Sequence, residues 1–303
     1  MIDFKEFGPV SHEKWLDKID EDLKGAKVHG DFKYEIDPDW VISPFVSETA
    51  PGDFTIQGPK TIAGFKIRDK SEANANIKAL QGLINGAQGL VFEVGPMADF
   101  SLLFAGIHLE MVSVILRTDN EPTDIIPNLK NYLQTYAAAG SHVIVATPEN
   151  SITLDYHQSF RNRLAITKEY LEHSRQSGLS PLVFVGLKTN FLAQVAELRA
   201  IRMIWAKAGG RDNDLTIVSE SDPAVAVSRD VHPLIVSTYL LMSAVTGMSN
   251  MAVSIPWDDN PESARTGLNI MHVLEHESHL SRVVDPVAGS FLISRISREM
   301  AGI

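Results

Sequence analysis

Cysteine is absent from the 303-residue sequence. Its absence excludes disulfide scaffolds, thiolate metal sites and cysteine nucleophiles. Long hydrophobic runs are missing too, because the longest apolar stretch, residues 233–245, is shorter than a bilayer span and is interrupted by Ser237, Thr238 and Ser243. This stretch predicts a buried helix, and we expect no membrane segment. The chain opens without an apolar signal-type run, so we expect a cytoplasmic protein.

Positive charge is scarce. The 27 lysines and arginines stand against 38 aspartates and glutamates, which gives a formal net charge of −11. This balance argues against a general nucleic-acid binder, because phosphate binding needs clustered basic side chains. A small basic patch for a phosphorylated ligand stays open. The G-x-G-x-x-G, Walker and G-x-S-x-G patterns are also missing, so dinucleotide, nucleoside triphosphate and esterase functions have no positive signal.

The first sixty residues differ from the rest in composition and in the pattern of expected elements. Their proline, glycine and aspartate residues surround one amphipathic helix, which we expect at residues 11–24. Proline and glycine punctuate residues 41–60 too often for regular elements. We therefore predict an N-terminal arm or cap over residues 1–60.

From residue 71 onward, amphipathic helices alternate with short β-branched runs. The expected strands cover residues 90–94, 112–116, 143–146, 152–156, 182–186, 215–219 and 251–255, with a short eighth candidate at 290–293. Helices separate all of these runs except the pair at 143–146 and 152–156, so right-handed crossovers and a parallel sheet follow. We predict an α/β fold, a (β/α)8 TIM barrel over residues 61–303 that carries the arm.

One helix, expected at residues 262–281, carries a pattern that resembles a zinc site. His272, Glu275 and His276 match the H-x-x-E-H arrangement of an inverted zinc-peptidase helix. Leu268 and Met271 belong to the apolar stripe of the same helix, so the histidines also fit its solvated flank. We favour the second interpretation and expect no metal site.

The C-terminal ends of the predicted strands form the mouth of such a barrel, where these folds place their sites. The polar candidates there are Glu93, Arg117, Asp155, Tyr156, His157, Lys188, Thr189, Asn190, Glu220, Asp222, Trp257 and Asp258. Polar residues gather at any barrel mouth, so for each of these residues taken alone we expect a structural role before a catalytic one. As substrate-binding candidates we select Lys188, Thr189, Asn190, Glu220 and Trp257.

Two long motifs resemble the methylmalonyl-CoA mutase family. Residues 186–207 resemble the family pattern, roughly G-x-x-x-N-F-x-x-E-[IV]-A-x-L-R-A-x-R-x-L-W, without a gap, and residues 275–291 resemble E-E-S-x-L-x-x-V-x-D-P-x-G-G-S-Y, nearest to the small (beta) subunit. Weaker similarity at residues 7–25, 83–90 and 237–258 extends the resemblance over nearly the whole chain. It implies the family's barrel and a role in adenosylcobalamin-dependent isomerisation of methylmalonyl-CoA and succinyl-CoA, in propionate metabolism.

The sequence departs from the family at the residues that act on substrate. The family's R-T-H-x-Q-T-S-G-W-S-L segment, which contacts the CoA ester, is replaced by a shorter stretch with Glu220 and Asp222, whose charge is wrong for an anionic thioester. The catalytic tyrosine of T-I-R-Q-Y-A-G-F is missing near residues 61–65. His157, in a remnant of Y-H-x-Q-E-A-G, is the one candidate for a surviving catalytic group.

The residues at the family's cofactor-binding positions also depart from the family pattern. The family's cobalamin-facing glutamate is Gln194 here, the candidate for a cofactor contact. Asp230 and His232 resemble the start of a cobalamin-ligating loop, but the glycine that this loop needs does not follow, and a helix-capping role suits Asp230 better. The sequence ends at Ile303, where family members continue into a cobalamin-binding domain. We expect this domain to be absent or truncated, adenosylcobalamin to be bound by a partner chain, and no cofactor to be ligated here.

Three functions follow as alternatives. The first is a non-catalytic structural subunit that pairs with the catalytic large subunit in a heterodimer, or with itself when isolated. The second is an acyl-CoA-binding mutase barrel that uses cobalamin from a separate chain, with His157 as an acid and Lys188 near the phosphates. The third is an unrelated small-molecule-binding barrel that uses Asn190, Glu220 and Trp257. An open bore would contradict the first alternative, and a filled bore would contradict the second.

Overall fold

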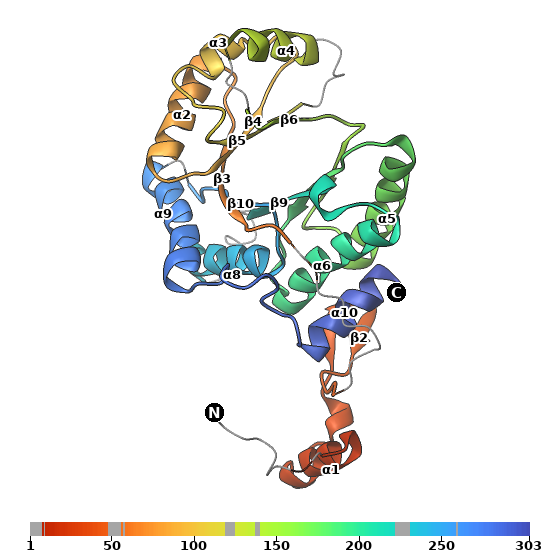
Figure 1. Cartoon of the computed structure of the whole chain (residues 1–303). Coiled ribbons are helices and arrows are strands. Elements are labelled where there is room, and N and C mark those ends of the chain that lie inside the picture. The colour runs from red at the N-terminus through yellow and green to blue at the C-terminus, as the bar shows by residue number, and fades with distance from the viewer. Residues whose placement is uncertain are drawn as a thin grey trace.

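A computed structural model describes residues 8, 10–47, 56, 58–118, 125–136, 140–221, 231–258 and 260–303. Eight parallel strands form a nearly closed barrel in the order β6-β5-β4-β3-β10-β9-β8-β7, with helices outside (Figure 1). The strands are β3 (Ile62–Ile67), β4 (Gly89–Glu93), β5 (Ser113–Arg117), β6 (Val143–Ala146), β7 (Ser151–Leu154), β8 (Leu182–Gly186), β9 (Thr216–Ser221) and β10 (Met251–Ser254). The predicted α/β barrel is confirmed.

The outer layer consists of helices that begin at local capping signals. They are α2 (Glu72–Ile84), α3 (Phe100–Leu103), α4 (Ile125–Tyr136), α5 (Phe160–Ser177), α6 (Phe191–Lys207), α8 (Pro233–Thr246), α9 (Pro261–His272) and α10 (Phe291–Ala301). Ser159 accepts a hydrogen bond from the backbone of the first turn of α5, and Asn260 does the same for α9, as N-caps should. Within the described ranges, no helix combines the length and the apolar character needed to cross a membrane.

Two expectations about the strands were wrong. Residues 290–293 are the start of α10 and not a strand, because the Ser290 hydroxyl caps that helix. The eighth strand is β3. The sequence does not show it as an alternating apolar run, because Gly64 and Lys66 lie within it. Gly64 is required there, since a Cβ at this position would lie 2.6 Å from Cγ of Met251 and 2.7 Å from Cγ2 of Val253.

The barrel has a seam between β6 and β7, which do not pair with each other. A four-residue turn, 147–150, replaces the helix that usually connects two such strands. Asn150 holds this turn: its Oδ1 accepts from the backbone N of Thr147 at 2.8 Å, and its Nδ2 donates to the carbonyl of Val145 at 2.9 Å. The two expected strands that no helix separates are therefore β6 and β7, which a hydrogen-bonded turn connects. They are the two edge strands of the sheet.

The bore of the barrel is filled by side chains. Alternate residues of a barrel strand point inward, and those of six strands, β4, β5, β6, β8, β9 and β10, form one buried cluster. Its members are Val91, Ile115, Ala146, Leu182, Phe184, Val218, Met251 and Val253. Each of these residues is at most 2% exposed. We call this set the interior cluster.

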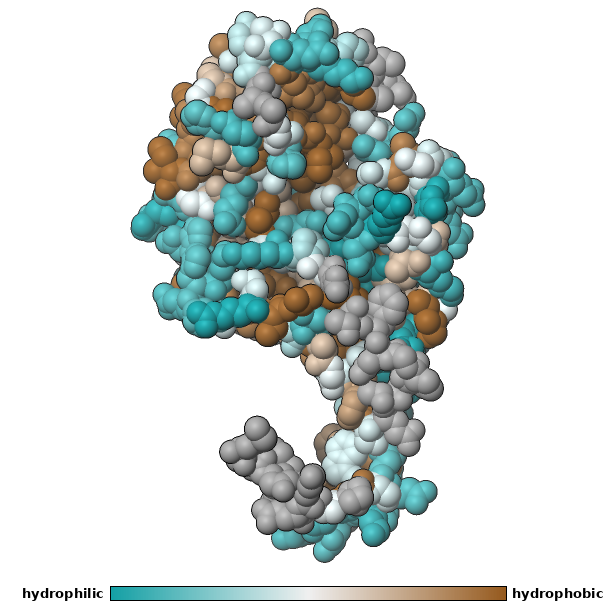
Figure 2. All heavy atoms as spheres, viewed as in Figure 1, coloured by the Kyte–Doolittle hydropathy of each residue, from teal (hydrophilic) through white to brown (hydrophobic). Residues whose placement is uncertain are grey.

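The N-terminal arm consists of α1 (His12–Asp22), a single turn at His29–Asp31, and an antiparallel hairpin of β1 (Tyr34–Asp37) and β2 (Trp40–Ile42). The hairpin packs on the barrel, whereas α1 projects away from it (Figure 1) and lies in the narrow extension below the barrel in the space-filling view (Figure 2). None of the 11 residues of α1 is buried. The division of the chain at residue 60 stays a prediction.

Candidate functional site

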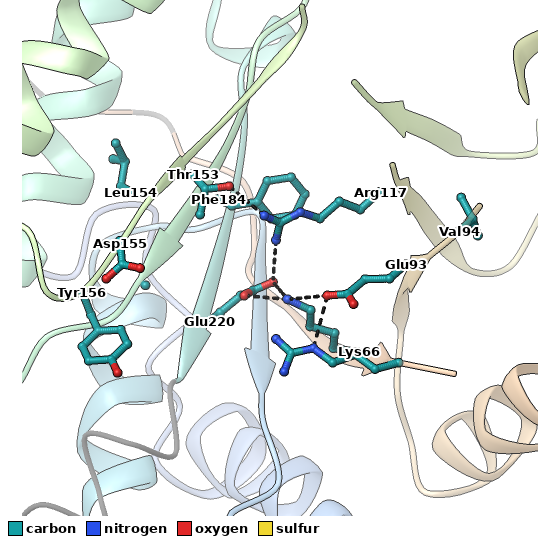
Figure 3. Close-up of a pocket in the computed structure, with 12 residues that line it drawn as sticks. Lys66, Glu93, Val94, Arg117, Thr153, Leu154, Asp155, Tyr156, Phe184 and Glu220 are labelled. Atoms are coloured by element: carbon teal, nitrogen blue, oxygen red, sulfur yellow. Dashed lines mark hydrogen bonds and ion pairs between the residues drawn. The ribbon is translucent and has the colours of Figure 1, made fainter. Parts of the chain in front are cut away.

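Four charged side chains meet at the mouth of the barrel. Lys66, Glu93, Arg117 and Glu220 lie at the C-terminal ends of β3, β4, β5 and β9 and point inward (Figure 3). We call them the mouth network. β5, β4 and β3 are neighbours in the sheet, whereas β9 lies across the barrel from β5, so the network spans the bore directly above the interior cluster.

Lys66 is the centre of the network. Its Nζ lies 2.9 Å from both carboxylate oxygens of Glu220 and 3.4 Å from Oε1 of Glu93. The Lys66 side chain is 3% exposed and that of Glu220 is 13% exposed. Because an unpaired buried charge is costly, each group here depends on its partner.

Arg117 is held by an aromatic ring and a hydroxyl. Its guanidinium carbon lies 4.6 Å from the ring centroid of Phe184, within cation–π range. Its Nη2 donates to Oγ1 of Thr153 at 2.9 Å, and its Nη1 lies 4.0 Å from Oε1 of Glu220. Arg68, at the rim, donates from Nε to Glu93 at 3.2 Å.

A cavity of about 450 Å³ opens above the network, and we call it the mouth cavity. Its lining consists of Lys66, Arg68, Glu93, Val94, Arg117, Thr153, Leu154, Asp155, Tyr156, Phe184, Gly186 and Glu220. Phe184 belongs both to this lining and to the interior cluster. The interior cluster therefore closes the floor of the cavity, and the cavity is not the entrance of an axial tunnel.

The structure brings five of the expected mouth residues to the cavity: Glu93, Arg117, Asp155, Tyr156 and Glu220. Two further lining residues, Lys66 and Arg68, were missed because β3 was not predicted as a strand. The spacing Ile62, Gly64, Lys66 is the signal that could have found them, since alternate residues of a strand share one face.

His157 lies beside the cavity but does not line it. It is exposed, its backbone N donates to Oδ1 of Asp155 at 2.8 Å, and its ring lies 3.9 Å from that of Tyr156. Thr189 and Trp257 are half-buried and also lie outside the lining. Asp222 and Asp230 lie outside the described residues.

Lys188 turns away from the mouth cavity toward α5. Its Nζ donates to the carbonyl of Gln158 at 2.7 Å and lies 4.3 Å from the ring centroid of Phe160. Burial lowers the pKa of Lys188, and the positive charge of Arg163 lowers that pKa further. The side chain thus has a local structural partner.

Asn190 connects the barrel to the arm. Its Nδ2 donates to the carbonyl of Glu35 at 2.8 Å, and its Oδ1 accepts from the hydroxyl of Tyr34. The backbone N of Arg161 donates to Oδ2 of Asp37 at 3.0 Å. These bonds fix the hairpin against the β8–α6 loop and the first turn of α5.

Gln194 is fully buried between helices. Its Oε1 accepts from the backbone N of Lys188 at 2.8 Å, and its Nε2 donates to Glu197 at 2.9 Å. Glu197 also accepts from Nη2 of Arg163 at 2.8 Å, and both side chains are 0% exposed. Burial raises the pKa of Glu197 and lowers that of Arg163, while the attraction between them opposes both shifts.

Metal ligation has no support in the described part of the chain, where no three His, Asp or Glu side chains are grouped as a metal site needs. The rings of His272 and His276 stack with their centroids 6.1 Å apart, and Glu275 pairs with Lys60.

The family model and the curated relatives that match this chain carry the same name. The family model described as methylmalonyl-CoA mutase matches residues 155–302. The methylmalonyl-CoA mutase small subunit of Streptomyces virginiae is 25% identical, over 86% of this chain and 52% of the relative. That of Porphyromonas gingivalis is 21% identical, over 98% of this chain and 62% of the relative. The large subunit of Propionibacterium freudenreichii subsp. shermanii is 30% identical, over 39% of this chain and 18% of the relative.

The chain spans about half the length of the Streptomyces relative. The region matched by the family model contains both long motifs, at residues 186–207 and 275–291. Residues 155–302 are thus similar to the methylmalonyl-CoA mutase family, and the similarity to two small subunits of that enzyme extends over 86% and 98% of the chain.

Proposed function

We propose that this chain is a small subunit of an adenosylcobalamin-dependent methylmalonyl-CoA mutase and that it is a structural, non-catalytic partner of the large subunit. The filled bore carries this proposal. A thioester that enters along the barrel axis would have to displace the interior cluster, including Phe184 and Val218, and break the Lys66–Glu220 ion pair. Opening this axis would leave buried charges unpaired, which costs several kcal/mol in total.

Substrate and cofactor chemistry support the same proposal. Glu220 occupies the barrel mouth where the family's ester-binding segment supplies basic residues, and its charge is compensated by Lys66 within the chain. The described residues also do not fit a corrin: both amide atoms of Gln194 are engaged in internal hydrogen bonds. Adenosylcobalamin is accordingly assigned to the partner chain, and no reaction step is assigned to this barrel.

The arm supports a subunit role. Helix α1 is amphipathic, yet none of its residues is buried within the chain. Trp15 and Phe45 pack edge to face with their centroids 5.7 Å apart, but Trp15 is still 37% exposed. An apolar helix face that the described residues leave uncovered suits contact with another subunit. We assign the large subunit as that contact, with propionate metabolism in the cytoplasm as the setting.

The test is reconstitution with a large subunit. We expect the full chain alone to bring about no isomerisation of methylmalonyl-CoA when adenosylcobalamin is supplied, and to co-purify with a co-expressed large subunit. Spectrophotometric detection of succinyl-CoA measures the activity, and size-exclusion chromatography measures the assembly. Turnover by the isolated chain would refute the structural role and favour an acyl-CoA-binding barrel that takes cobalamin from a separate chain.

A further inference from the structure

Among the described cations that line the mouth cavity, Arg117 is the one whose carboxylate neighbour lies farthest away, at 4.0 Å. Both oxygens of Glu220 are bound by Lys66 at 2.9 Å, and Glu93 is bound by Arg68 and Lys66. Among the described residues, the carboxylate oxygen that Arg117 approaches is that of Glu220, at 4.0 Å, beyond hydrogen-bond distance. On this wall of the cavity, these three cations and two carboxylates leave one positive charge in surplus, which the Asp155 carboxylate on the opposite wall balances.

The guanidinium of Arg117 is also fixed in place before any ligand binds. One face lies on the ring of Phe184, which itself is 1% exposed, and Nη2 is hydrogen-bonded to Thr153. The side chain is 24% exposed, so it remains accessible from the cavity. A planar, preorganised guanidinium with unused N–H groups is suited to a carboxylate, which it can bind through two parallel hydrogen bonds.

The opposite wall of the cavity has different chemistry. Asp155 and Tyr156, from the segment after β7, lie apart from the mouth network (Figure 3). The Asp155 carboxylate is exposed, and it would accept a hydrogen bond from a hydroxyl or ammonium but repel a second carboxylate. The cavity volume of about 450 Å³ is within the range of small-molecule sites.

We propose that the mouth cavity is a binding site for a small organic acid with one carboxylate and a neighbouring hydroxyl or ammonium group. Arg117 and Thr153 bind the carboxylate, and Asp155 accepts from the donor group. The filled bore below excludes a longer ligand along the axis. The site is a property of this chain alone, so it does not depend on the proposed subunit role.

Calorimetric titration of the full chain with four probes tests this site. Lactate and alanine carry a carboxylate beside a hydroxyl or an ammonium, propionate lacks the donor, and succinate replaces it with a second carboxylate. We expect saturable binding of lactate or alanine with a dissociation constant of about 1 mM or lower, and weaker binding of propionate and succinate. Absence of saturable binding for all four probes would overturn the proposal, and equal binding of propionate would overturn the role of Asp155.

Substitution separates the site from adventitious binding. Arg117→Gln removes the charge and half of the fork, and we expect it to weaken binding of the tighter probe at least about tenfold. Arg265→Gln is the matched control, because Arg265 lies on the exposed face of α9, paired with Glu262. Circular dichroism melting verifies that both variants fold. Unchanged affinity in a folded R117Q variant would place the ligand elsewhere.

Discussion

Helices α6 and α1 are opposite extremes of burial in one chain. Thirteen consecutive residues of α6, from Ala193 to Trp205, are buried, because α10 covers the side of α6 that faces away from the barrel. None of the residues of α1 is buried. Helix α6 is thus stabilised by packing within the chain, whereas the apolar face of α1 lacks a comparable partner among the described residues. The proposed contact with the large subunit would supply such a partner for α1.

The largest effect is expected where this contrast is strongest, at the ion pair between α5 and α6. Arg163→Ala leaves the carboxyl group of Glu197 0% exposed and without its guanidinium partner. We expect the free energy of unfolding, measured by urea denaturation, to fall by about 3–5 kcal/mol. The double variant Arg163→Met/Glu197→Leu should recover most of this loss, because it removes both charges.

A surface pair provides the matched control for that prediction. Arg265→Ala breaks the exposed pair with Glu262, with side chains 51% and 59% exposed, and should cost less than about 1 kcal/mol. Equal losses for Arg163→Ala and Arg265→Ala would show that the burial of α6 does not determine the energetics of its charged residues.

A smaller effect is expected at the barrel mouth. Lys66→Met removes the partner of Glu220, which is 13% exposed and borders the cavity. Water in the cavity can solvate the remaining carboxylate in part, so we expect a loss of about 1.5–3 kcal/mol in the free energy of unfolding. Lys66→Met/Glu220→Gln should reverse part of it. A loss as large as that of Arg163→Ala would mean that water solvates Glu220 at the mouth no better than it solvates Glu197 between α5 and α6.

The sequence predicted the barrel but only part of its mouth. β-branched runs revealed β4, β5 and β8, because buried parallel strands read as nearly continuous apolar segments. The apolar residues after Ser290 fit a strand as well as a helix, since so short a run has no readable period. The sequence also placed Asn190 and Glu220 at strand ends, yet it could not reveal that Asn190 turns toward the arm. That direction depends on where the hairpin docks.

The attachment of the arm should have an intermediate cost. Asn190→Ala removes the bonds to Glu35 and Tyr34, which are partly solvated, so we expect a fall of about 0.5–1.5 kcal/mol in the free energy of unfolding. Limited proteolysis should cut the arm faster while the barrel stays intact. Asn131→Ala, on the exposed side of α4, should change neither. Cleavage of barrel and arm at equally increased rates would contradict a separate attachment.

The smallest effect on the chain itself is expected in α1. Leu16→Ala/Ile19→Ala truncates two half-buried residues of its apolar face, and because this face packs on little within the chain, the free energy of unfolding should change by only about 0.5 kcal/mol. If the large subunit covers this face, the same double variant should nevertheless co-purify with it less well. Asp17→Asn, on the exposed side of α1, should leave co-purification unchanged. A clear loss of stability without any change in co-purification would mean that α1 is stabilised within the chain, as α6 is.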